Sequence, residues 1–322
     1  MDKNLQNILL FGKNGQIGWE LQRTLAPLGN LVVADRGDKT LPLDLANPDD
    51  IRRMIREIRP ALIVNAAAYT QVDKAEDEID KAMAINGKAP GVIAEEAYRI
   101  GAALVHYSTD YVFDGKSKTP YRETDIPNPI NAYGQTKLEG DRAIEASGGS
   151  YLILRTSWIY GIRGENFLLT MLRLARERET LQIVDDQIGS PTWSRQIAES
   201  TAQILSRASC RSGARNNLDF WEYLSDIKGV YNLTSSGTTS WYGFAKAILE
   251  DTTGLITNRI KEISPIPTTA YPVPAPRPPF SAMSGDKLFQ TFGQRLPHWH
   301  HALDLCLKDW AEYALGGSRG QG

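Results

Sequence analysis

A glycine-rich turn near the N-terminus is the feature that most constrains the fold of this chain. It separates a short apolar run, residues 8–11, from a helical pattern of apolar residues between positions 17 and 25. Its glycines, Gly12, Gly15 and Gly18, follow a GxxGxxG spacing rather than GxGxxG. They would permit a tight turn, let backbone amides approach a pyrophosphate, and let the helix pack closely on the strand. The segment therefore predicts a dinucleotide-binding site with the helix N-terminus facing the anion.

The next strand, residues 31–34, ends at a carboxylate placed where dinucleotide-binding folds hold a ribose. Asp35 lies twenty residues after Gly15, and such an acid favours NADH by binding its ribose hydroxyls. Arg36 follows directly, and it would either accommodate the 2′-phosphate of NADPH or remain a solvated loop charge. The pair leaves NADPH, NADH or both open as the cofactor.

Acidic and small residues also follow the next two apolar segments. Asp44 would be either an adenine-contacting acid at a strand end or a simple turn residue. Residues 61–64 run into Ala66, Ala67 and Ala68, which would either leave room for a flat ligand or mark a packed helix contact. Because strands alternate with helices from the first residues onward, we predict an α/β fold with a doubly wound parallel sheet of the Rossmann type.

A strand-end hydroxyl and a Tyr-x-x-x-Lys pair supply the candidate chemistry. The apolar run 103–107 leads into Ser108 and Thr109, and Tyr133 and Lys137 follow on a predicted helix. Their spacing of four places the phenol and the amine on one helix face. We expect the Lys137 cation to lower the pKa of Tyr133, which then donates a proton to a carbonyl oxygen as hydride arrives. Thr109 (or Ser108) would hydrogen-bond the same oxygen.

The same spacing occurs a second time, at Tyr242 and Lys246. No strand-end hydroxyls precede this second pair, and it lies beyond the region where a parallel sheet is predicted. We therefore interpret it as a surface helix pair. The spacing alone is a weak signal, and the context of Tyr133 and Lys137 decides between them.

The alternation of strands and helices loosens in the second half of the chain. Residues 151–155 form one more apolar strand, and Trp158 beyond it would either contact a sugar or base or pack in the core. After Gly164 we predict a second, smaller α/β substrate domain, with the proline-dense segment 265–279 as a loop pinned against it. We expect the cofactor domain to span residues 1–163 with about 194–236, the substrate domain about 164–193 with 237–315, and a disordered tail at 316–322.

Composition excludes several other classes of protein. A net charge of −2 and a pI of about 6.1 offer no basic surface for nucleic acid or an anionic membrane. Two cysteines, Cys210 and Cys306, give no disulfide framework and fit a reduced, cytoplasmic setting. No stretch is long and apolar enough to cross a membrane. The histidines at 298, 300 and 301 have no acidic neighbour in sequence, so we expect no metal site there.

Several segments together resemble the extended short-chain dehydrogenase/reductase family over residues 8 to about 280. They are ILLFGKNGQIGWELQ, VNAAAYTQVDKAE, HYSTDYVFDG, NAYGQTKLEG, LRTSWIYG, ENFLLTMLRLA, DDQIGSPT and PTTAYPVPAPRP. The resemblance implies NAD(P)H-dependent reduction of the C4 keto group of dTDP-4-dehydro-L-rhamnose, a nucleotide-sugar substrate. Two alternatives stay open: an epimerase acting on a nucleotide sugar, and a non-catalytic regulatory subunit of the same fold.

The resemblance also implies roles for individual residues. Tyr133, Lys137 and Thr109 match the catalytic set. The cofactor would contact Gly12, Gly15, Gln16, Ile17, Gly18, Asp35, Arg36, Asp44, Leu45, Ala66, Ala67, Ala68, Tyr133 and Lys137. The substrate would contact Thr109, Asp110, Tyr111, Trp158, Asn166, Gln187 and Arg277, with Arg277 pairing with a diphosphate.

One position departs from the family. Some members form homodimers bridged by Mg²⁺ between acidic side chains, and Glu20 matches one such acid. Arg195 stands where another acid would be expected, and a cation there would repel Mg²⁺. We therefore expect no metal-bridged dimer, but a monomer or a weak homodimer.

Overall fold

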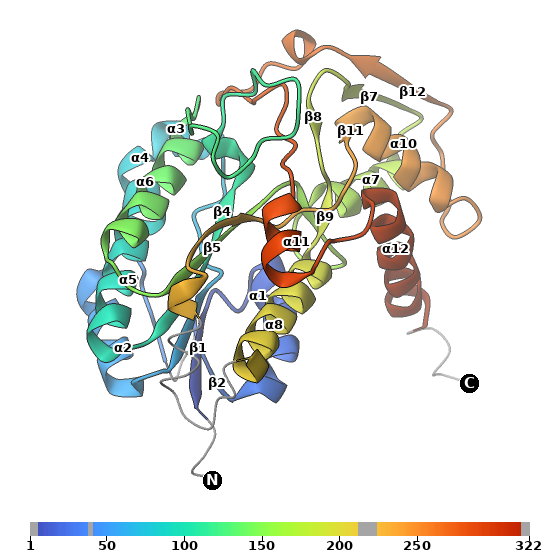
Figure 1. Cartoon of the computed structure of the whole chain (residues 1–322). Helices are drawn as coiled ribbons and strands as arrows, with labels where there is room; N and C mark the ends of the chain where they lie inside the picture. Colours follow the sequence, from blue (N-terminus) through green and yellow to red (C-terminus); the bar gives the residue numbers. More distant parts are fainter. Residues whose placement is uncertain (1–5, 38–40, 212–223, 317–322) are drawn as a thin grey trace.

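A six-stranded parallel sheet forms the centre of the molecule (Figure 1). The computed structural model describes residues 6–37, 41–211 and 224–316; the tail expected to be disordered lies almost wholly outside these residues. The strand order is β10-β5-β4-β3-β1-β2. Their bounds are β1 Asn7–Phe11, β2 Asn30–Ala34, β3 Leu62–Asn65, β4 Ala103–Thr109, β5 Tyr151–Thr156 and β10 Gly229–Asn232. The predicted doubly wound parallel sheet is confirmed.

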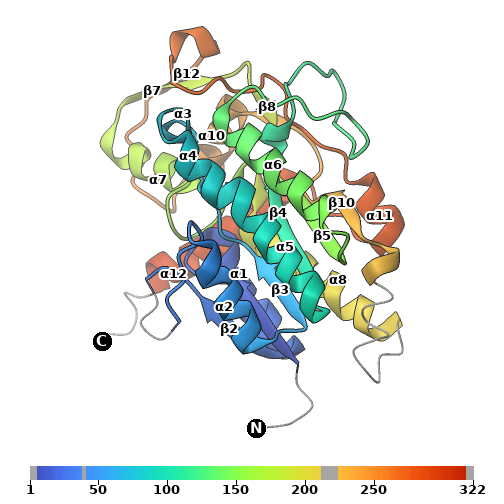
Figure 2. The same ribbon diagram turned by 90° about the vertical axis from the view of Figure 1, so that its left-hand side faces the viewer.

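Helices cover both faces of this sheet (Figure 2). On one side lie α2 (Pro48–Ile58), α5 (Ala89–Ile100) and α6 (Ala132–Ala146), and on the other α1 (Gln16–Leu25), α8 (Ser194–Arg211) and α11 (Asp286–Phe292). Side chains alternate along each strand, so Leu9 packs with one helical layer and Leu10 with the other. Burial on both faces explains why the strands are continuous apolar runs.

Short helical segments connect the strands to the longer helices. They are η1 (Ala26–Leu28), α3 (Lys74–Asp77), α4 (Ile79–Ala82), the π-helix η2 (Met83–Lys88) and η3 (Asp110–Val112). The helical stretch from Lys74 to Lys88 is thus interrupted at Glu78. Helix α6 begins where Asn131 accepts a hydrogen bond from the Gly134 amide at 2.8 Å, which satisfies one free amide of its first turn.

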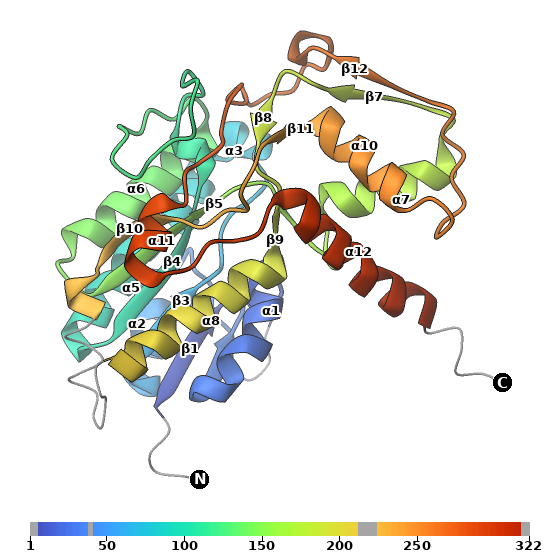
Figure 3. The same ribbon diagram turned by 45° about the vertical axis from the view of Figure 1, so that its right-hand side comes forward.

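A third apolar core lies beside the sheet and belongs to the smaller α/β part of the fold (Figure 3). It is built mainly from α7 (Phe167–Glu177), α10 (Trp241–Asp251) and α12 (Trp299–Gly316). The remaining elements there are β6 Ile159–Tyr160, β7 Thr180–Val184, β8 Ile188–Gly189, β9 Thr192–Trp193, β11 Thr239–Ser240, β12 Glu262–Ile266 and η4 Thr268–Ala270.

The expected domain boundaries remain a prediction, and one segment crosses them. Leu288, Phe292 and Leu296 fall within the range assigned to the substrate domain, yet they pack in a core on the sheet. The proline-dense segment 265–279, predicted as a loop, begins at the end of β12 and includes the 3-10 turn η4. Within the described residues, no helix combines the length and apolar character needed to cross a membrane.

Candidate active site

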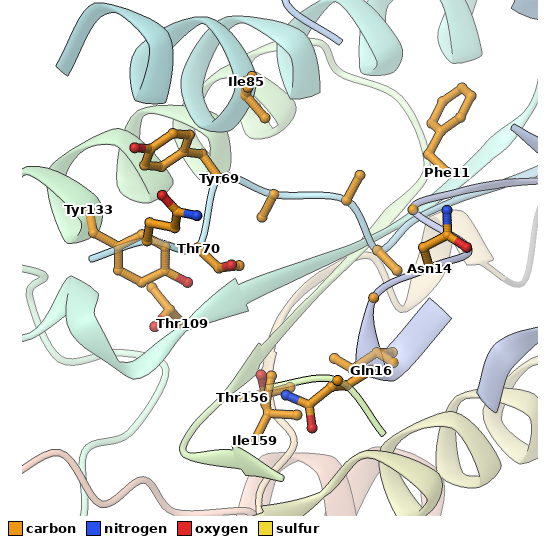
Figure 4. A pocket seen from close by; sticks show the side chains of 18 of the residues that line it. Phe11, Asn14, Gln16, Tyr69, Thr70, Ile85, Thr109, Tyr133, Thr156 and Ile159 are labelled. Atoms are coloured by element: carbon orange, nitrogen blue, oxygen red, sulfur yellow. The ribbon is translucent and has the colours of Figure 1, made fainter. Parts of the chain in front are cut away.

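A cavity of about 940 Å³ opens beyond the carboxyl ends of the central strands (Figure 4). Figure 4 shows Tyr133 and Thr109 together at one end of this pocket and Asn14 at the other. Most of the predicted cofactor and substrate residues line it: Gly12, Gly15, Gln16, Ile17, Asp35, Arg36, Asp44, Leu45, Ala66, Ala67, Ala68, Thr109, Asp110, Tyr111, Tyr133 and Trp158. Ligands of open α/β sheets bind at this edge.

The glycine turn makes a cradle that side chains would fill. Gly12 has a φ of +85°, and a Cβ there would lie 2.6 Å from the Ala67 backbone nitrogen. A Cβ on Gly18 would collide with the Gly12 carbonyl, so Gly18 supports the turn from behind and does not line the pocket. Helix α1 begins at Gln16, and its first amides face the cavity, where an anion would be stabilised.

The far end of the pocket carries the residues expected at the adenosine. Asp35 accepts a hydrogen bond from the Asn14 amide at 3.1 Å, and Arg36 lines the same wall. Asp44 accepts from the Ala46 backbone amide at 3.0 Å, so it shapes a turn as well as lining the pocket. Sequence reasoning passed over Asn14, although its place inside the glycine turn was a usable signal.

The catalytic end brings hydroxyl, phenol and carboxyl groups together. Thr109 donates to Asp110 Oδ1 at 3.1 Å and hydrogen-bonds Tyr133. Removal of the phenol from water, together with the charge of Asp110, raises the pKa of Tyr133 to about 12, although the Thr109 hydrogen bond opposes this. Burial raises the pKa of Asp110 to about 7, and its Oδ2 has no hydrogen-bond partner.

Lys137 does not act on Tyr133 as the sequence led us to expect. Its amine is buried beneath the pocket, donates to the Tyr107 carbonyl at 2.6 Å and lies 3.1 Å from His106 Nε2. Burial lowers the pKa of Lys137 to about 8. The expectation that this cation lowers the pKa of Tyr133 is wrong for the protein without ligand, because the phenol is desolvated and the amine is engaged elsewhere.

Trp158 lies at the mouth of the pocket in a constrained position. Its φ is +45°, a region that non-glycine residues rarely adopt. Its ring stacks on Trp241 with centroids 3.6 Å apart and planes 3° from parallel, and Gly189 lies against it, where a Cβ would collide. Both tryptophans line the pocket. Sequence reasoning missed Trp241, which belongs to α10 and comes into range only through the fold.

Three predicted substrate residues lie outside the lining of the pocket. Asn166 caps α7 and donates to Gln16 Oε1 at 3.1 Å. Gln187 donates to Thr268 at 3.0 Å. Arg277 pairs with both oxygens of Asp73, at 2.6 and 2.8 Å. Their roles toward a nucleotide stay predictions, and the structure gives each an internal partner. Further lining residues that the sequence did not single out include Phe11, Tyr69, Thr70, Gln71, Val72, Lys81, Ile85 and Glu165.

The two candidate metal regions differ in their contacts. Arg195 lies between Glu20, at 3.5 Å, and Asp309, so an internal cation pairs with the acid matched to the family's Mg²⁺ site. His300 Nε2 lies 3.1 Å from Asp251 of α10, so the fold supplies an acidic neighbour that the local sequence does not. Among the described residues, no group of three or more metal-ligating side chains could hold an ion.

Comparisons with known proteins match almost the whole chain. A family model described as "RmlD substrate binding domain" matches residues 6–312. A protein of Burkholderia thailandensis named dTDP-4-dehydrorhamnose reductase is 47% identical over 305 residues, covering 94% of this chain and 98% of that protein. An Escherichia coli protein of the same name is 45% identical over 304 residues, covering 94% and 97%. A crystal structure of the Bacillus anthracis reductase in complex with NADP has a TM-score of 0.82 at 32% identity, covering 95% and 99%.

Proposed function

This chain belongs to the RmlD substrate binding domain family, and we propose from that premise that it reduces the C4 keto group of dTDP-4-dehydro-L-rhamnose with NAD(P)H. The observation that carries the proposal is 47% identity along nearly the entire chain to a reductase of that name. The pocket supports it, because a strand-end threonine and the tyrosine of a Tyr-x-x-x-Lys pair meet where a parallel sheet binds ligands.

The pocket fits a nicotinamide dinucleotide. The Gly12 and Gly15 turn and the start of α1 would hold the pyrophosphate, because these residues line the pocket and the glycines carry no side chain that would occupy it. Asp35, held by Asn14, and Arg36 would meet the adenosine ribose or its phosphate. Both residues line the pocket, so the choice between NADH and NADPH stays open. Their contacts with cofactor are part of the proposal.

Residues at the catalytic end would supply the proton that the C4 oxygen takes up during reduction. NAD(P)H supplies the hydride when bound. Tyr133 stays protonated throughout the physiological range because its pKa is raised to about 12, so it can donate to the oxygen that becomes an alkoxide at C4. Thr109 orients that phenol, and its single hydroxyl proton would reach the same oxygen if it turned away from Asp110. Lys137 would reach the nicotinamide ribose from the pocket floor, once its amine leaves His106.

Further residues that line the pocket would contact the substrate. Asp110 and Tyr111 lie beside Tyr133, whose ring meets the Tyr111 ring edge to face at 5.8 Å. Trp158 lines the pocket with one ring face stacked on Trp241 and with Gly189 close to its indole nitrogen, so part of its ring edge would remain for a ligand. We infer that this edge packs on the sugar. The nucleotide would extend toward Asn166, Gln187 and Arg277.

The test is cofactor stoichiometry. Adding dTDP-4-dehydro-L-rhamnose to the protein with NADPH should oxidise one equivalent of NADPH per sugar reduced, followed at 340 nm. An epimerase would return its hydride and show no net oxidation, and a non-catalytic subunit would show no reaction at all. The rate of NADPH oxidation with UDP sugars that carry the same ketone would show how strongly the activity depends on the identity of the nucleotide. Absence of net NADPH oxidation would overturn the proposal.

We also propose that the protein is a monomer or a weak homodimer that does not depend on Mg²⁺. The ion pairs of Arg195 with Glu20 and Asp309 support this, because the guanidinium already compensates those carboxylates. Sedimentation with and without EDTA tests it, and a dimer lost in EDTA would contradict it. A cytoplasmic location stays a prediction, which cell fractionation would check.

A further inference from the structure

A buried histidine touches the amine of the Tyr-x-x-x-Lys pair. His106 lies on β4, in the middle of the sheet, with none of its surface exposed. Its Nε2 is 3.1 Å from the Lys137 Nζ of α6, and its Nδ1 is 3.1 Å from the Asn65 side-chain nitrogen of β3. Asn65 is equally buried, with 1% of its surface exposed. The three side chains form a row beneath the pocket.

The donors and acceptors around His106 determine which of its ring nitrogens carries the proton. The Ala67 backbone amide donates to Asn65 Oδ1 at 3.2 Å, so the amino group of Asn65 faces His106. An amino group donates, and His106 Nδ1 therefore accepts. A neutral imidazole has one N–H, which must then lie on Nε2 and point at Lys137. An ammonium has no lone pair to receive it, whereas a neutral amine does.

The surroundings of Lys137 favour loss of its proton. Burial lowers its pKa to about 8, opposed by Asp141 on its own helix. That carboxylate is shared with Arg155 of β5 at 3.5 Å and with Ser108, which donates to it at 2.8 Å. On the other side, η2 and α5 meet α6 through Asn86, Pro90 and Gly91, none of them charged. Asp110 of η3 acts on the neighbouring phenol rather than on the amine.

We propose that Asn65 and His106 are positioning residues that favour the neutral form of the Lys137 amine in the free protein, by fixing His106 as the Nε2–H tautomer. The amine accepts from Nε2–H and donates to the Tyr107 carbonyl. It takes up a proton from solvent when it leaves His106 for the pocket. The inference rests on the proposed role of Lys137 toward the cofactor, but its first test needs neither cofactor nor turnover.

That first test is the tautomer itself. The chain has four histidines, so ¹⁵N-histidine NMR of the free protein gives few signals, and those absent from His106→Gln belong to His106. We expect a neutral ring with the proton on Nε2 at pH 9, above the pKa of Lys137. We expect no imidazolium between pH 6 and 9, because burial holds the pKa of His106 well below its usual value. A proton on Nδ1, or a ring that titrates near its usual pKa, overturns the proposal.

Asn65→Asp reverses the arrangement with almost no change in shape. A carboxylate keeps the Ala67 hydrogen bond but accepts from Nδ1–H, which leaves Nε2 with a lone pair for an ammonium. We expect the NMR signals to switch tautomer. We also expect the alkaline limb of kcat/KM for NADPH to move up by about one pH unit, a tenfold gain in activity above the limb.

The double variant Asn65→Asp/His106→Phe separates the tautomer from simple charge. Without the imidazole only the direct attraction between the new carboxylate and Lys137 remains, so the shift that Asn65→Asp causes should be clearly smaller on the His106→Phe background. Equal shifts in both backgrounds would mean that charge alone explains the effect, and the proposal would fail. Loss of NADPH oxidation in every variant and in the wild type would instead count against the proposed function, while the tautomer result would stand.

Discussion

The two Tyr-x-x-x-Lys segments of this protein are nearly the same in sequence and local structure but lie in different surroundings. Tyr133 and Tyr242 are each the second residue of a helix, α6 and α10. Each helix is capped two residues before the tyrosine, by Asn131 and by Ser240, and each cap accepts from the amide of the glycine after the tyrosine, at 2.8 and 2.9 Å. Local sequence therefore builds the same helix start twice.

The difference lies in what surrounds each pair. Lys137 is 1% exposed and meets a histidine and a backbone carbonyl. The Lys246 side chain is 55% exposed and faces Glu250 at 3.8 Å, one helical turn away. Tyr133 lines the cavity beside Thr109, while Tyr242 is not among the lining residues. The chemistry thus follows from the surroundings of the motif. The prediction that no strand-end hydroxyls precede the second pair is wrong, because β11 ends at Ser240, directly before α10.

The largest expected difference is in turnover. Tyr133→Phe removes the proton source and should lower kcat by about 10³-fold, whereas Tyr242→Phe should leave kcat within about twofold of the wild type. Initial rates of NADPH oxidation with saturating keto-sugar nucleotide would measure both. Retained turnover in Tyr133→Phe would remove the basis of the comparison.

The lysines should differ next. Lys137→Met deletes the group proposed to hold the nicotinamide ribose and should lower kcat/KM for NADPH by about 10²-fold. Lys246→Met, its matched control, loses one exposed pair worth roughly 0–1 kcal/mol of stability and should keep its kinetics. Similar losses of kcat/KM in both variants would contradict the expectation that the surroundings of each lysine decide its importance.

The glycine after each tyrosine allows the packing around the two helix starts to be compared through the free energy of unfolding. A Cβ on Gly134 would collide with the backbone carbonyl of Tyr111, and a Cβ on Gly243 would meet only the end of the Thr239 side chain. We expect Gly134→Ala to lower the free energy of unfolding by about 1–3 kcal/mol. Gly243→Ala should stay within about 1 kcal/mol of the wild type, because the side chain can turn away and alanine favours helix. Urea unfolding followed by circular dichroism would compare them, and equal losses would contradict the packing difference.

The smallest effect concerns pH. A lysine whose pKa is lowered is an ammonium below that pKa and a neutral amine above it, so the free protein loses the Lys137 charge as pH rises through about 8. We expect kcat/KM for NADPH to fall about tenfold per pH unit above this point. Lys246→Met should keep the same profile. A rate that stays level to pH 9.5 would show that the buried amine does not need its charge.

Sequence patterns could locate the sheet and one end of the site because these depend on neighbours along the chain. Continuous apolar runs predicted five of the strands around the cofactor region. The glycine at position 12 likewise predicted a tight turn, because glycine readily adopts the positive φ that this turn requires. Hydroxyls directly after the run 103–107 had to lie at the sheet edge, because parallel strands end there together.

What the tertiary structure decided is which side chains from distant segments meet, and with what charge. The stack of Trp241 on Trp158, the ion pair of Arg277 with Asp73 and the contact of His106 with Lys137 each join separate elements. No local period encodes such contacts. The protonation of Lys137 shows the physical reason most clearly: burial and hydrogen bonding set the pKa of an amine, and both exist only once β3, β4 and α6 have packed together.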